Sequence, residues 1–451
     1  MTTALILLAA GKGTRMKSDL PKVLHPIASA PMLAHAMRAG AALEPERVIV
    51  VAGHEAEAVG RAAAEVDPRA HVVVQAEQLG TAHAVAQAAP ALEGFSGDAV
   101  VLYGDTPFVR PETLTRMAEA RRTHDVVVLG FEAADPARYG RLIMTGDSLD
   151  QIVEFKDATD KERAVTFCNS GIVMADARRL MDLVARVDNA NAAGEYYLTD
   201  IVALARSDGL SATAIACDEA ETMGINSRAE LALAERAFQA RARDVALENG
   251  VTLSAPDTVQ FAFDTVLGRD CLIEPNVVFG PAVTVETGAR IRAFTHLEDT
   301  HIARGAVVGP FARVRGGTEI SEHVKIGNFV ELKNAQLDEG VKIGHLSYVG
   351  DAHVGENTNI GAGTITCNYD GVMKHRTEVG ARAFIGSNTM LVAPVTVGDE
   401  AMTASGSVIT KDVDAGALAI ARGAQVTKPG MARKLMDLLK TKKKKHEQEN
   451  D

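Results

Sequence analysis

The first residues that suggest chemistry form a glycine-rich turn close to the N-terminus. The stretch LLAAGKGTRM, residues 7–16, runs from an apolar segment into Gly11, Gly13 and Arg15, and Lys22 follows shortly after. Backbone N–H groups in such a turn, together with nearby cations, are typical of sites that bind phosphate groups. The turn therefore predicts a phosphate-binding loop that follows a buried strand.

Two familiar phosphate-binding patterns do not fit this turn. Lys12 is not followed by Ser or Thr, and the four-residue gap between the glycines of a P-loop is absent. Met16 stands where the dinucleotide-binding pattern has its third glycine. The glycines alone are also compatible with a tight turn that binds nothing, but the cations Arg15 and Lys22 favour a phosphate ligand.

Composition limits the class of protein. The 451 residues, 47% of them hydrophobic, are enough for two or three domains. The net charge of -12, with basic residues clustered only in the C-terminal tail, argues against a nucleic-acid partner. Cys168, Cys217, Cys271 and Cys367 have no metal-binding spacing, which is typical of reduced thiols in the cytoplasm. No apolar run approaches the roughly 18 to 20 residues of a membrane helix, so we expect a cytoplasmic protein without a membrane partner.

Strand and helix patterns alternate in the first half of the chain. Four apolar runs are separated by helix-like segments such as residues 81–92. The runs cover residues 47–53, 71–75, 99–105 and 125–131. Strands that are apolar on both faces and separated by helices predict a doubly wound α/β domain with a parallel sheet, over residues 1–226.

A single helix is predicted between the two halves, over residues 227–249. The segment is rich in Ala, Glu, Leu and Arg, it begins with Ser227 as a candidate cap, and it ends at Gly250. We therefore interpret it as a linker.

The hydrophobic period changes to six after Gly250. Branched residues occupy every sixth position in Ile302, Val308, Val314 and Ile320, and the series continues after slips of one residue. This is the hexapeptide signature of a parallel β-helix, in which three units of about 18 residues make one triangular coil. Neither a strand period of two nor a helix period of 3.6 fits as well. We predict a β-helix over residues 250–430.

Two segments of the second half depart from the repeat. Residues 366–378, TCNYDGVMKHRTE, interrupt it while the coils on both sides continue, which predicts a functional loop. Residues 431–451 predict a C-terminal helix and a basic, disordered tail. The lysines of the tail are either solvated or close to the phosphates of a bound cofactor.

The motifs of the first half resemble those of nucleoside-diphosphate-sugar pyrophosphorylases, whose signature LAAGxGTRM is followed by PK. The further motifs appear in order as QAEQLGTAHA, YGDTP, RYGR, IVEFKDAT, CNSGI, EYYLTD and GINSR. Together with the hexapeptide half, the chain is similar from Leu7 to about Arg422 to a family of bacterial bifunctional uridylyltransferase and acetyltransferase enzymes. The resemblance implies a Rossmann-like nucleotidyltransferase domain joined to a left-handed β-helix.

This family resemblance also implies two reactions. In the C-terminal half, glucosamine-1-phosphate is acetylated by acetyl-CoA. In the N-terminal half, UMP is transferred from UTP to N-acetylglucosamine-1-phosphate, and pyrophosphate is released. The implied product, UDP-N-acetylglucosamine, supplies bacterial envelope polymers, and the implied metal cofactor is Mg²⁺.

In the N-terminal half, the resemblance implies that Arg15 and Lys22 act as catalytic cations and that Asp105 and Asn226 bind Mg²⁺, which prefers hard oxygen ligands. Without the motif, an Asp after a strand is more often a helix cap. Gln75 would read the uracil edge, because an amide offers both a donor and an acceptor. The implied contacts to UTP and UDP-N-acetylglucosamine are Leu8, Ala9, Ala10, Gly11, Lys22, Gln75, Gly80, Thr81, Tyr103, Gly104, Asp105, Gly140, Glu154, Asn169 and Asn226.

In the C-terminal half, the resemblance implies that His345 is the catalytic base, since imidazole accepts a proton near neutral pH. A lone histidine on such a repeat is otherwise more often a plain surface residue. Glucosamine-1-phosphate would contact Arg315, Lys333, Tyr348 and Asn359, with Asn368 and Tyr369 beside it. Acetyl-CoA would contact Ala362, Asn368, Tyr369, Ser387, Ser405 and Arg422.

Three positions depart from the family pattern, namely Gly316, Met373 and Ser405. They concern the details of the contacts to the cofactor and not the class of reaction. The resemblance also implies a homotrimer in which neighbouring subunits share each acetyl-transfer site.

Two other functions remain open from the residues. One is a nucleotidyltransferase whose β-helix serves only assembly or regulation, and the intact GHLSY and NYDG motifs argue against it. The other is a non-catalytic scaffold, which the presence of Arg15, Lys22 and Asp105 disfavours.

Overall fold

The computed structural model describes residues 2–53, 55–137 and 139–448. Contacts between residues divide the chain into two compact units. The first contains residues 1–245 and 261–264, and the second contains residues 246–260 and 265–451. Among the described helices, none is long and apolar enough to cross a membrane.

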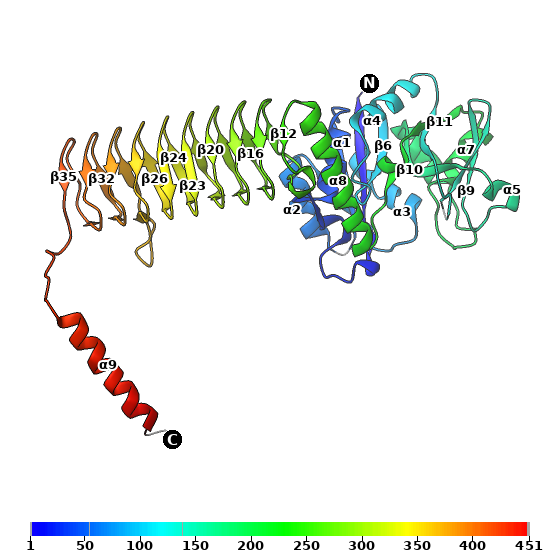
Figure 1. Ribbon diagram of the computed structural model, residues 1–451. Helices are drawn as coiled ribbons and strands as arrows, with labels where there is room; N and C mark the ends of the chain where they lie inside the picture. The colour runs from blue at the N-terminus through cyan, green and yellow to red at the C-terminus, as the bar shows by residue number, and fades with distance from the viewer. Residues whose placement is uncertain (1, 54, 138, 449–451) are drawn as a thin grey trace. The chain divides into compact units, whose positions relative to one another are not determined.

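The first unit is built around a mixed β-sheet with helices on both faces (Figure 1). Its strands are β1 (Thr3–Ala9), β2 (Pro26–Ile27), β3 (Ala30–Pro31), β4 (Arg47–Ala52), β5 (His71–Val74), β6 (Asp98–Tyr103), β7 (Val126–Glu132), β8 (Arg141–Thr145), β9 (Ser148–Val153), β10 (Phe167–Asp176) and β11 (Ala212–Cys217). Its helices are α1 (Met32–Ala41), α2 (Ala56–Val66), α3 (Thr81–Ala86), α4 (Pro111–Ala120), α5 (Asp160–Arg163), α6 (Ala177–Val184), α7 (Asp200–Ser207) and α8 (Arg228–Glu248). Short 3₁₀ turns are η1 (Thr14–Met16), η2 (Lys22–Leu24), η3 (Pro90–Leu92) and η4 (Glu219–Thr222), and η5 (Pro256–Thr258) belongs to the second unit.

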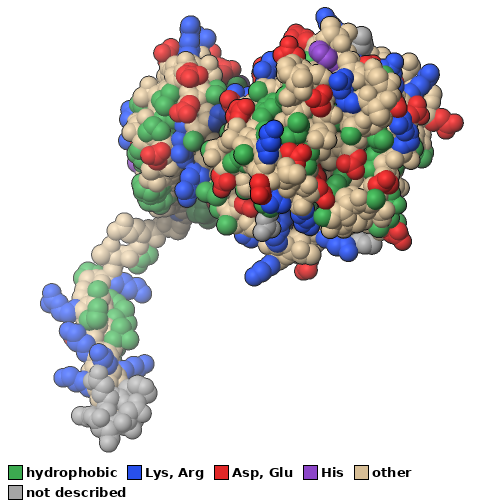
Figure 2. All heavy atoms as spheres, turned by 90° about the vertical axis from the view of Figure 1, so that its right-hand side faces the viewer, with side chains coloured by type: hydrophobic (Ala, Val, Ile, Leu, Met, Phe, Trp, Pro, Cys, Tyr) green, Lys and Arg blue, Asp and Glu red, His purple; other side chains and the backbone are tan. Residues whose placement is uncertain are grey.

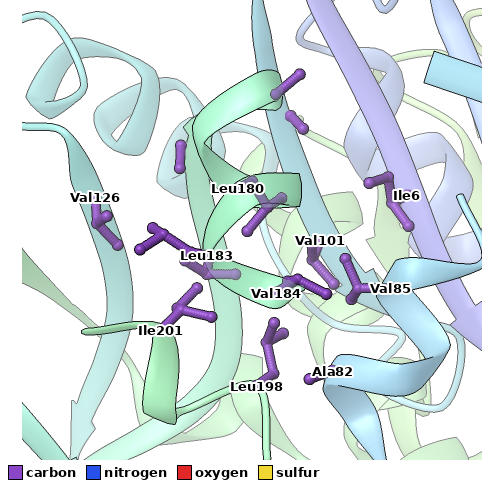
Figure 3. Packing of buried hydrophobic residues seen from close by; sticks show 14 of the residues in the cluster. Ile6, Ala82, Val85, Val101, Val126, Leu180, Leu183, Val184, Leu198 and Ile201 are labelled. Carbon is purple, nitrogen blue, oxygen red and sulfur yellow. The ribbon is translucent and has the colours of Figure 1, made fainter. Parts of the chain in front are cut away.

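The sheet buries both of its faces, as the apolar runs predicted. Successive residues of β1 point to opposite sides, so Leu5 and Leu7 belong to one hydrophobic cluster and Ile6 belongs to the other. Figure 3 shows Ile6 and Val101 of the sheet on the side where α6 packs. Each such fully buried aliphatic side chain contributes about 1.5–3 kcal/mol to stability.

The strand order β11-β7-β10-β6-β1-β4-β5 confirms the doubly wound class, but the sheet is mixed and not wholly parallel as predicted. β10 runs antiparallel to both β6 and β7, whereas β1, β4, β5 and β6 are parallel. The apolar run in β10 is buried on both faces, and this burial pattern does not reveal the direction of a central strand.

Both helices predicted by residue range are present, but the first is shorter than predicted, whereas the second has nearly the predicted ends. The helix predicted over 81–92 stops at Ala86, and a 3₁₀ turn starts at Pro90, because proline has no N–H to continue the ladder. α8 matches the predicted linker, and the Glu230 N–H donates to the Ser227 hydroxyl at its start (3.3 Å). Most of α8 is grouped with the first unit.

The second unit is the left-handed parallel β-helix that the six-residue period predicted (Figure 1). Its described strands lie on three faces. The first face carries β12 (Thr252–Leu253), β14 (Leu272–Ile273), β17 (Arg290–Ile291), β20 (Val307–Val308), β23 (Lys325–Asn328), β25 (Lys342–His345), β27 (Asn359–Ile360), β30 (Phe384–Ile385), β33 (Met402–Thr403) and β35 (Leu418–Ala419).

The other two faces share two long strands that turn a corner, β24 (Glu331–Leu337) and β26 (Tyr348–Val354). The second face also carries β15 (Val278–Phe279), β18 (His296–Leu297), β21 (Arg313–Arg315), β28 (Ile365–Cys367), β31 (Met390–Val392) and β34 (Val408–Ile409). The third face also carries β13 (Val266–Leu267), β16 (Val283–Val285), β19 (Thr300–Ile302), β22 (Thr318–Ile320), β29 (Thr377–Val379) and β32 (Val395–Val397).

Branched residues stack inside the β-helix in register. On the first face, Val308 pairs with Ile326, Ile326 with Ile343, and Ile343 with Ile360, and all four are at most 3% exposed. The loop at residues 366–378 projects from the stack (Figure 1), so the predicted interruption of the repeat is confirmed.

The C-terminal segment differs from the prediction. α9 (Met431–Gln448) continues through the lysine run, so the predicted disorder of the basic tail is wrong as far as residue 448. Lys, Leu, Met, Glu and Gln all favour a helix, which explains the extension. In Figure 2 basic side chains lie along this helix beside a strip of hydrophobic ones. Residues 449–451 lie outside the described residues.

Candidate functional sites

A cavity of about 330 Å³ lies in the first unit at the carboxyl ends of the sheet strands. β1 lies between β4 and β6, so the direction in which the chain winds across the sheet reverses beside it. Such a switch point is where open α/β folds bind ligands. The predicted residues that line the cavity are Leu8, Ala9, Ala10, Gly11, Lys22, Gln75, Gly80, Thr81, Tyr103 and Asp105. Lining residues that the sequence analysis did not assign are Val23, Gln78, Ala84 and Glu195.

The glycine-rich turn holds the stem of Lys22. Gly13 has a φ of 57°, in the left-handed region that favours glycine. A Cβ at Gly13 would also lie 2.6 Å from the Lys22 Cβ. Both the backbone angle and the close approach therefore require glycine at this position.

Lys22 connects the two predicted metal ligands. Its ammonium forms an ion pair with Asp105 and donates to the Asn226 Oδ1 at 3.0 Å. Asp105 is thus an ion-pair partner and not a helix cap. The Ile225 N–H also donates to the Asp105 carbonyl oxygen (3.0 Å), which fixes the two segments beside each other.

One end of the cavity is shaped by an amide and a tight turn. The buried Gln75 Nε2 donates to the Gly80 carbonyl oxygen at 3.2 Å and lies 3.0 Å from the His83 Nδ1. A Cβ at Gly80, whose φ is 127°, would lie 2.5 Å from the Tyr196 carbonyl oxygen. The Thr81 hydroxyl accepts from the Leu198 N–H (2.9 Å). Tyr196 and Leu198 of the EYYLTD segment therefore pack against this turn and fix it. The side-chain oxygen of Gln75, Oε1, can then accept a hydrogen bond from a ligand.

Gly140, Glu154 and Asn169, which the family pattern assigns to the sugar of UDP-N-acetylglucosamine, lie together near Tyr103. A Cβ at Gly140 would lie 3.3 Å from the Glu154 Oε1, and the Asn169 N–H donates to the Gly140 carbonyl oxygen at 2.8 Å. Burial raises the pKa of Glu154, although the Thr199 hydroxyl donates to its Oε1 (3.3 Å). Burial also raises the pKa of Tyr103, and the charges of Asp105 and Glu154 add to this effect. Tyr103 thus connects the sugar-binding residues to the cavity.

Six of the predicted residues do not line the cavity, namely Arg15, Gly104, Gly140, Glu154, Asn169 and Asn226. Arg15 lies exposed on η1 and is not brought to the cavity. Gly104 is packed behind it, where a Cβ would lie 3.1 Å from a Val23 side-chain carbon. Gln78, which the sequence analysis missed, donates to the Ala10 carbonyl oxygen and so fixes the start of the glycine-rich turn. Gln78 could have been predicted as a residue of this site, because it belongs to the QAEQLGTAHA motif.

In the second unit, cations of neighbouring coils gather on one face. Arg315 pairs in register with Lys333, and the Arg315 guanidinium donates to Glu331 (3.1 Å). Lys374 from the irregular loop lies against Lys333 and, together with Arg315, lowers the pKa of Lys333. Lys374 was not predicted from the sequence, because its position depends on how the loop folds back.

Tyr348 covers the next coil beside these cations. A Cβ at Gly350, which pairs in register with Lys333, would lie 2.3 Å from the Tyr348 hydroxyl, so the ring needs glycine there. The buried Asn368 donates from Nδ2 to the Tyr348 hydroxyl (3.4 Å) and to Asp351. Asn368 thereby connects the irregular loop to the coil that carries the tyrosine.

Consecutive coils place His345 and the predicted acetyl-CoA contacts along one corner. The Gly363 N–H donates to the His345 carbonyl oxygen (3.4 Å), and the next coils repeat this bond from Asn388 to Ala362 (2.7 Å) and from Gly406 to Ser387 (2.8 Å). Ser405 precedes Gly406 on the following coil, and its carbonyl oxygen accepts from the Arg422 guanidinium (2.7 Å).

His345 is held by a residue that the sequence analysis missed. Its Nδ1 lies 2.7 Å from the Asn328 Oδ1, on the preceding coil and in register with it. Because an amide oxygen only accepts, Nδ1 carries the proton and Nε2 is left as the basic nitrogen. Asn328 could have been predicted from the sequence, because the repeat places it one coil before His345 at the corresponding position.

The remaining residues named from the family pattern lie at several places in the β-helix. Asn359 is on the first face, and the exposed Tyr369 donates from its hydroxyl to the Gly371 carbonyl oxygen (2.5 Å). The Met373 N–H donates to Asp370 (2.7 Å), while its side chain is exposed. Gly316 lies so close to Asp299 that a Cβ would be 2.7 Å from the Asp299 Oδ2.

Known proteins match the chain over its whole length. It is 70% identical to the bifunctional protein GlmU of Ruegeria sp. over 98% of this chain and 99% of that protein. The chain belongs to the GlmU family. It is also 69% identical to the family member of Cereibacter sphaeroides over 98% of this chain and 97% of that protein. The member from Ruegeria pomeroyi is 67% identical over 100% of both chains.

Two family models match separate parts of the chain. Residues 5–170 match the MobA-like NTP transferase domain, which covers the glycine-rich turn and much of the sheet. Residues 376–411 match the hexapeptide repeat of succinyl-transferase. The two models correspond to the α/β unit and the β-helix unit, so the family membership and the fold agree.

Proposed function

We propose that this chain makes UDP-N-acetylglucosamine in two reactions, one in each unit. The β-helix acetylates glucosamine-1-phosphate with acetyl-CoA, and the α/β unit transfers UMP from UTP to the product. The observation that supports the proposal is that, in a chain of the GlmU family, each unit brings together a separate group of the residues that the family pattern assigns to substrates. Both co-substrates belong to the cytoplasm, where we place the enzyme.

In uridylyl transfer, a phosphate oxygen of the sugar phosphate attacks the α-phosphorus of UTP, and pyrophosphate leaves. The protein needs no nucleophile of its own, so its task is to position two anions and neutralise their charge. Lys22 lies against the glycine-rich turn and supplies that charge inside the cavity. The free carbonyl oxygen of Gln75 can accept the uracil N3–H. Glu154 and Asn169 would hold the sugar hydroxyls and the N-acetyl group.

Asp105 and Asn226 fit a magnesium site because both present an oxygen to one cation, the Lys22 ammonium. No group of three His, Cys, Asp or Glu side chains in the described part of the chain could hold a metal. Two protein oxygens nevertheless suit Mg²⁺, which keeps several waters and binds substrate phosphates. Bound there, Mg²⁺ would neutralise the charge of the phosphates, and Lys22 would turn from Asp105 toward them.

In acetyl transfer, the amine of glucosamine-1-phosphate attacks the thioester carbonyl carbon, and coenzyme A leaves as the thiol. The amine must lose a proton, and Nε2 of His345 is available to accept it because Nδ1 is held by Asn328. Arg315, Lys333 and Lys374 would bind the sugar phosphate, and the anion would relieve the repulsion that lowers the pKa of Lys333. Ala362, Ser387, Ser405 and Arg422 would line the acetyl-CoA side.

We also propose that the β-helix forms a homotrimer that completes the acetyl-transfer site. Phe294, Phe311 and Phe329 stack on one corner, with ring centroids 4.8 and 5.4 Å apart. They are 52%, 47% and 55% exposed, and all have positive φ, which is unusual for a bulky residue. Leu346, directly after His345, extends this line. A second copy that covers these rings would reach the corner beside His345.

The test uses the purified full chain with glucosamine-1-phosphate, acetyl-CoA, UTP and Mg²⁺, and follows free thiol and pyrophosphate separately. We expect both products. With the His345→Ala variant, we expect loss of thiol release and recovery of pyrophosphate when N-acetylglucosamine-1-phosphate is supplied. Pyrophosphate from the acetylated substrate without any thiol release by the parent protein would instead mean that the β-helix is a scaffold.

A further inference from the structure

A second cavity of the α/β unit, of about 250 Å³, belongs to neither proposed site. Phe108 and Arg110 line it from the segment between β6 and α4, and Glu221 lines it from η4. Phe238 and Arg241 line it from α8, with Asp244 and two alanines completing the wall. The cavity is therefore bordered by two phenyl rings, two guanidinium groups and two carboxylates.

The guanidinium of Arg241 has a distinctive environment. It lies 5.6 Å from the centre of the Phe108 ring and 5.9 Å from that of Phe238. Among residues 2–53, 55–137 and 139–448, its contacts are with these two rings, and no residue forms a hydrogen bond or an ion pair with it. Arg110, by contrast, pairs with Asp218 at 3.0 Å and with Glu221 at 3.8 Å.

The charges around Arg241 leave it without a counter-ion. Burial lowers the pKa of Arg241, the neighbouring Arg110 adds to this effect, and Glu221 opposes it only in part. Glu221 is itself 3% exposed and accepts from the Arg110 N–H (3.0 Å) as well as pairing with its side chain. An anion placed at Arg241 would therefore meet a guanidinium that no other acceptor occupies.

We propose that this cavity binds a small organic monoanion, a carboxylate carried on a flat apolar body. The carboxylate matches the planar fork of Arg241, and the flat body matches the two phenyl rings beside it. A single negative charge fits because Arg110 is already neutralised by two carboxylates. A phosphate dianion would face Glu221 and Asp244 across the same small space, and we expect it to bind more weakly.

The cavity is connected to the proposed metal ligands through two short segments. Phe108 follows Asp105 by three residues, and Glu221 precedes Asn226 by five. The bonds from the Arg110 N–H to Glu221 and from the Ile225 N–H to the Asp105 carbonyl oxygen tie the segments together. A ligand between Phe108 and α8 would bias the spacing of Asp105 and Asn226, so the site should modulate uridylyl transfer. This second statement rests on the proposed function.

The test for binding is isothermal titration calorimetry of the full chain with 2-naphthoate, in parallel with the neutral isostere 2-naphthamide and with 2-naphthyl phosphate. We expect the carboxylate to bind most tightly. Arg241→Gln should weaken its binding about tenfold or more, since the charge-assisted bidentate pair is lost. Arg236→Gln is the matched control, because Arg236 is an exposed arginine of the same helix outside the cavity.

Equal binding by parent and Arg241→Gln, equal binding of 2-naphthamide, or no binding of 2-naphthoate overturns the site. The same titration needs no activity, so it stands apart from the proposed reactions. Pyrophosphate release is then followed at saturating 2-naphthoate, with thiol release as the internal control. A change in pyrophosphate release that Arg241→Gln removes supports the coupling, and an unchanged rate with confirmed binding overturns it.

Discussion

The two units position the residues of their proposed sites in opposite ways. In the α/β unit, Lys22, Gln75 and Asp105 line one cavity, and each is held by a partner from another part of the same unit. In the β-helix, His345 and Ser387 lie exposed on one corner, and each is positioned by the repeat itself. The α/β unit thus encloses its proposed site within one chain, whereas the β-helix presents only one edge of its proposed site.

This difference follows from the physics of the two folds. Parallel strands with different connections bring distant loops to one sheet edge, so residues separated by more than two hundred positions, such as Lys22 and Asn226, can meet. A solenoid brings together only residues of neighbouring coils. One corner of a β-helix cannot surround a substrate on several sides. The other residues of such a site must therefore come from an inserted loop, here residues 366–378, or from a second subunit.

The largest expected effect separates the two sites completely. His345→Ala removes the proposed base, and we expect acetyl transfer to fall by about 10²–10⁴. Uridylyl transfer to N-acetylglucosamine-1-phosphate should stay at the parent rate, because the variant changes only an exposed side chain of the other unit. Coupled assays of free thiol and pyrophosphate measure both rates. A parallel fall of both rates would contradict the separation.

Asn328→Ala should act at the same site with a smaller effect. The loss of one hydrogen bond that orients the His345 ring is expected to lower acetyl transfer about tenfold. We expect the loss in kcat and not in KM, because without the Asn328 oxygen the ring proton can sit on either nitrogen, so Nε2 is the free base in only part of the molecules. A change confined to the KM for glucosamine-1-phosphate would contradict this role for Asn328.

The reciprocal variant is Lys22→Ala. It removes the cation that lies between Asp105 and Asn226, and we expect uridylyl transfer to fall by about 10²–10³ while acetyl transfer is unchanged. Lys17→Ala is the control, since Lys17 is an exposed lysine just after the same turn and does not line the cavity. If both variants lose activity equally, general electrostatic attraction explains the effect and the specific position of Lys22 does not.

Phe311→Asp tests which of the two proposed sites depends on a neighbouring subunit. Asp tolerates the positive φ at this turn, so the coil should keep its shape while the apolar strip is interrupted by a charge. We expect a smaller particle in light scattering and acetyl transfer lowered about tenfold or more at low protein concentration, with uridylyl transfer unchanged. Leu418→Asp, an exposed residue on the last strand, is the control. An intact assembly with full acetyl transfer would show that this corner is not an interface.

The sequence predicted repeated patterns better than it predicted convergence in space. The six-residue period located the β-helix and its buried rungs, because every coil repeats the same environment at positions such as Ile326 and Ile343. The prediction of a wholly parallel sheet was wrong at β10, since the pattern of a strand buried on both faces is the same in either direction. The C-terminal helix was cut short, because a lysine run was interpreted as disordered although Lys is a good helix former.

The assigned residues divide in the same way. Motif spacing identified many residues of the proposed nucleotide cavity, but it could not show that Arg15 does not line this cavity. Asn328 and Lys374 were missed for different reasons. Asn328 could have been found by stepping one coil back from His345, whereas Lys374 depends on the path of a loop without a repeat.

The smallest expected effect concerns Glu154 and the pH dependence of stability. Burial raises its pKa in the folded chain, so the unfolded chain releases this proton at a lower pH than the folded one. Within that window the folded protein binds more protons, and stability falls as the pH rises through it and stays lower above it. Glu154→Gln should therefore match the parent at about pH 4 and exceed it at about pH 8, by less than about 1 kcal/mol, in denaturant unfolding of the α/β unit.

Glu154→Gln also shows whether burial of the charged Glu154 carboxylate destabilises the folded chain. Gln keeps an oxygen that can accept from the Thr199 hydroxyl, so any gain in stability comes from removing the charge. Glu195→Gln is the control, since Glu195 is an exposed carboxylate at the same cavity. If Glu154 binds the sugar, the ligand's hydroxyl groups would donate to its carboxylate and offset the burial. UDP-N-acetylglucosamine should then raise the unfolding midpoint more in the parent than in Glu154→Gln, and an equal rise in both would argue against this contact.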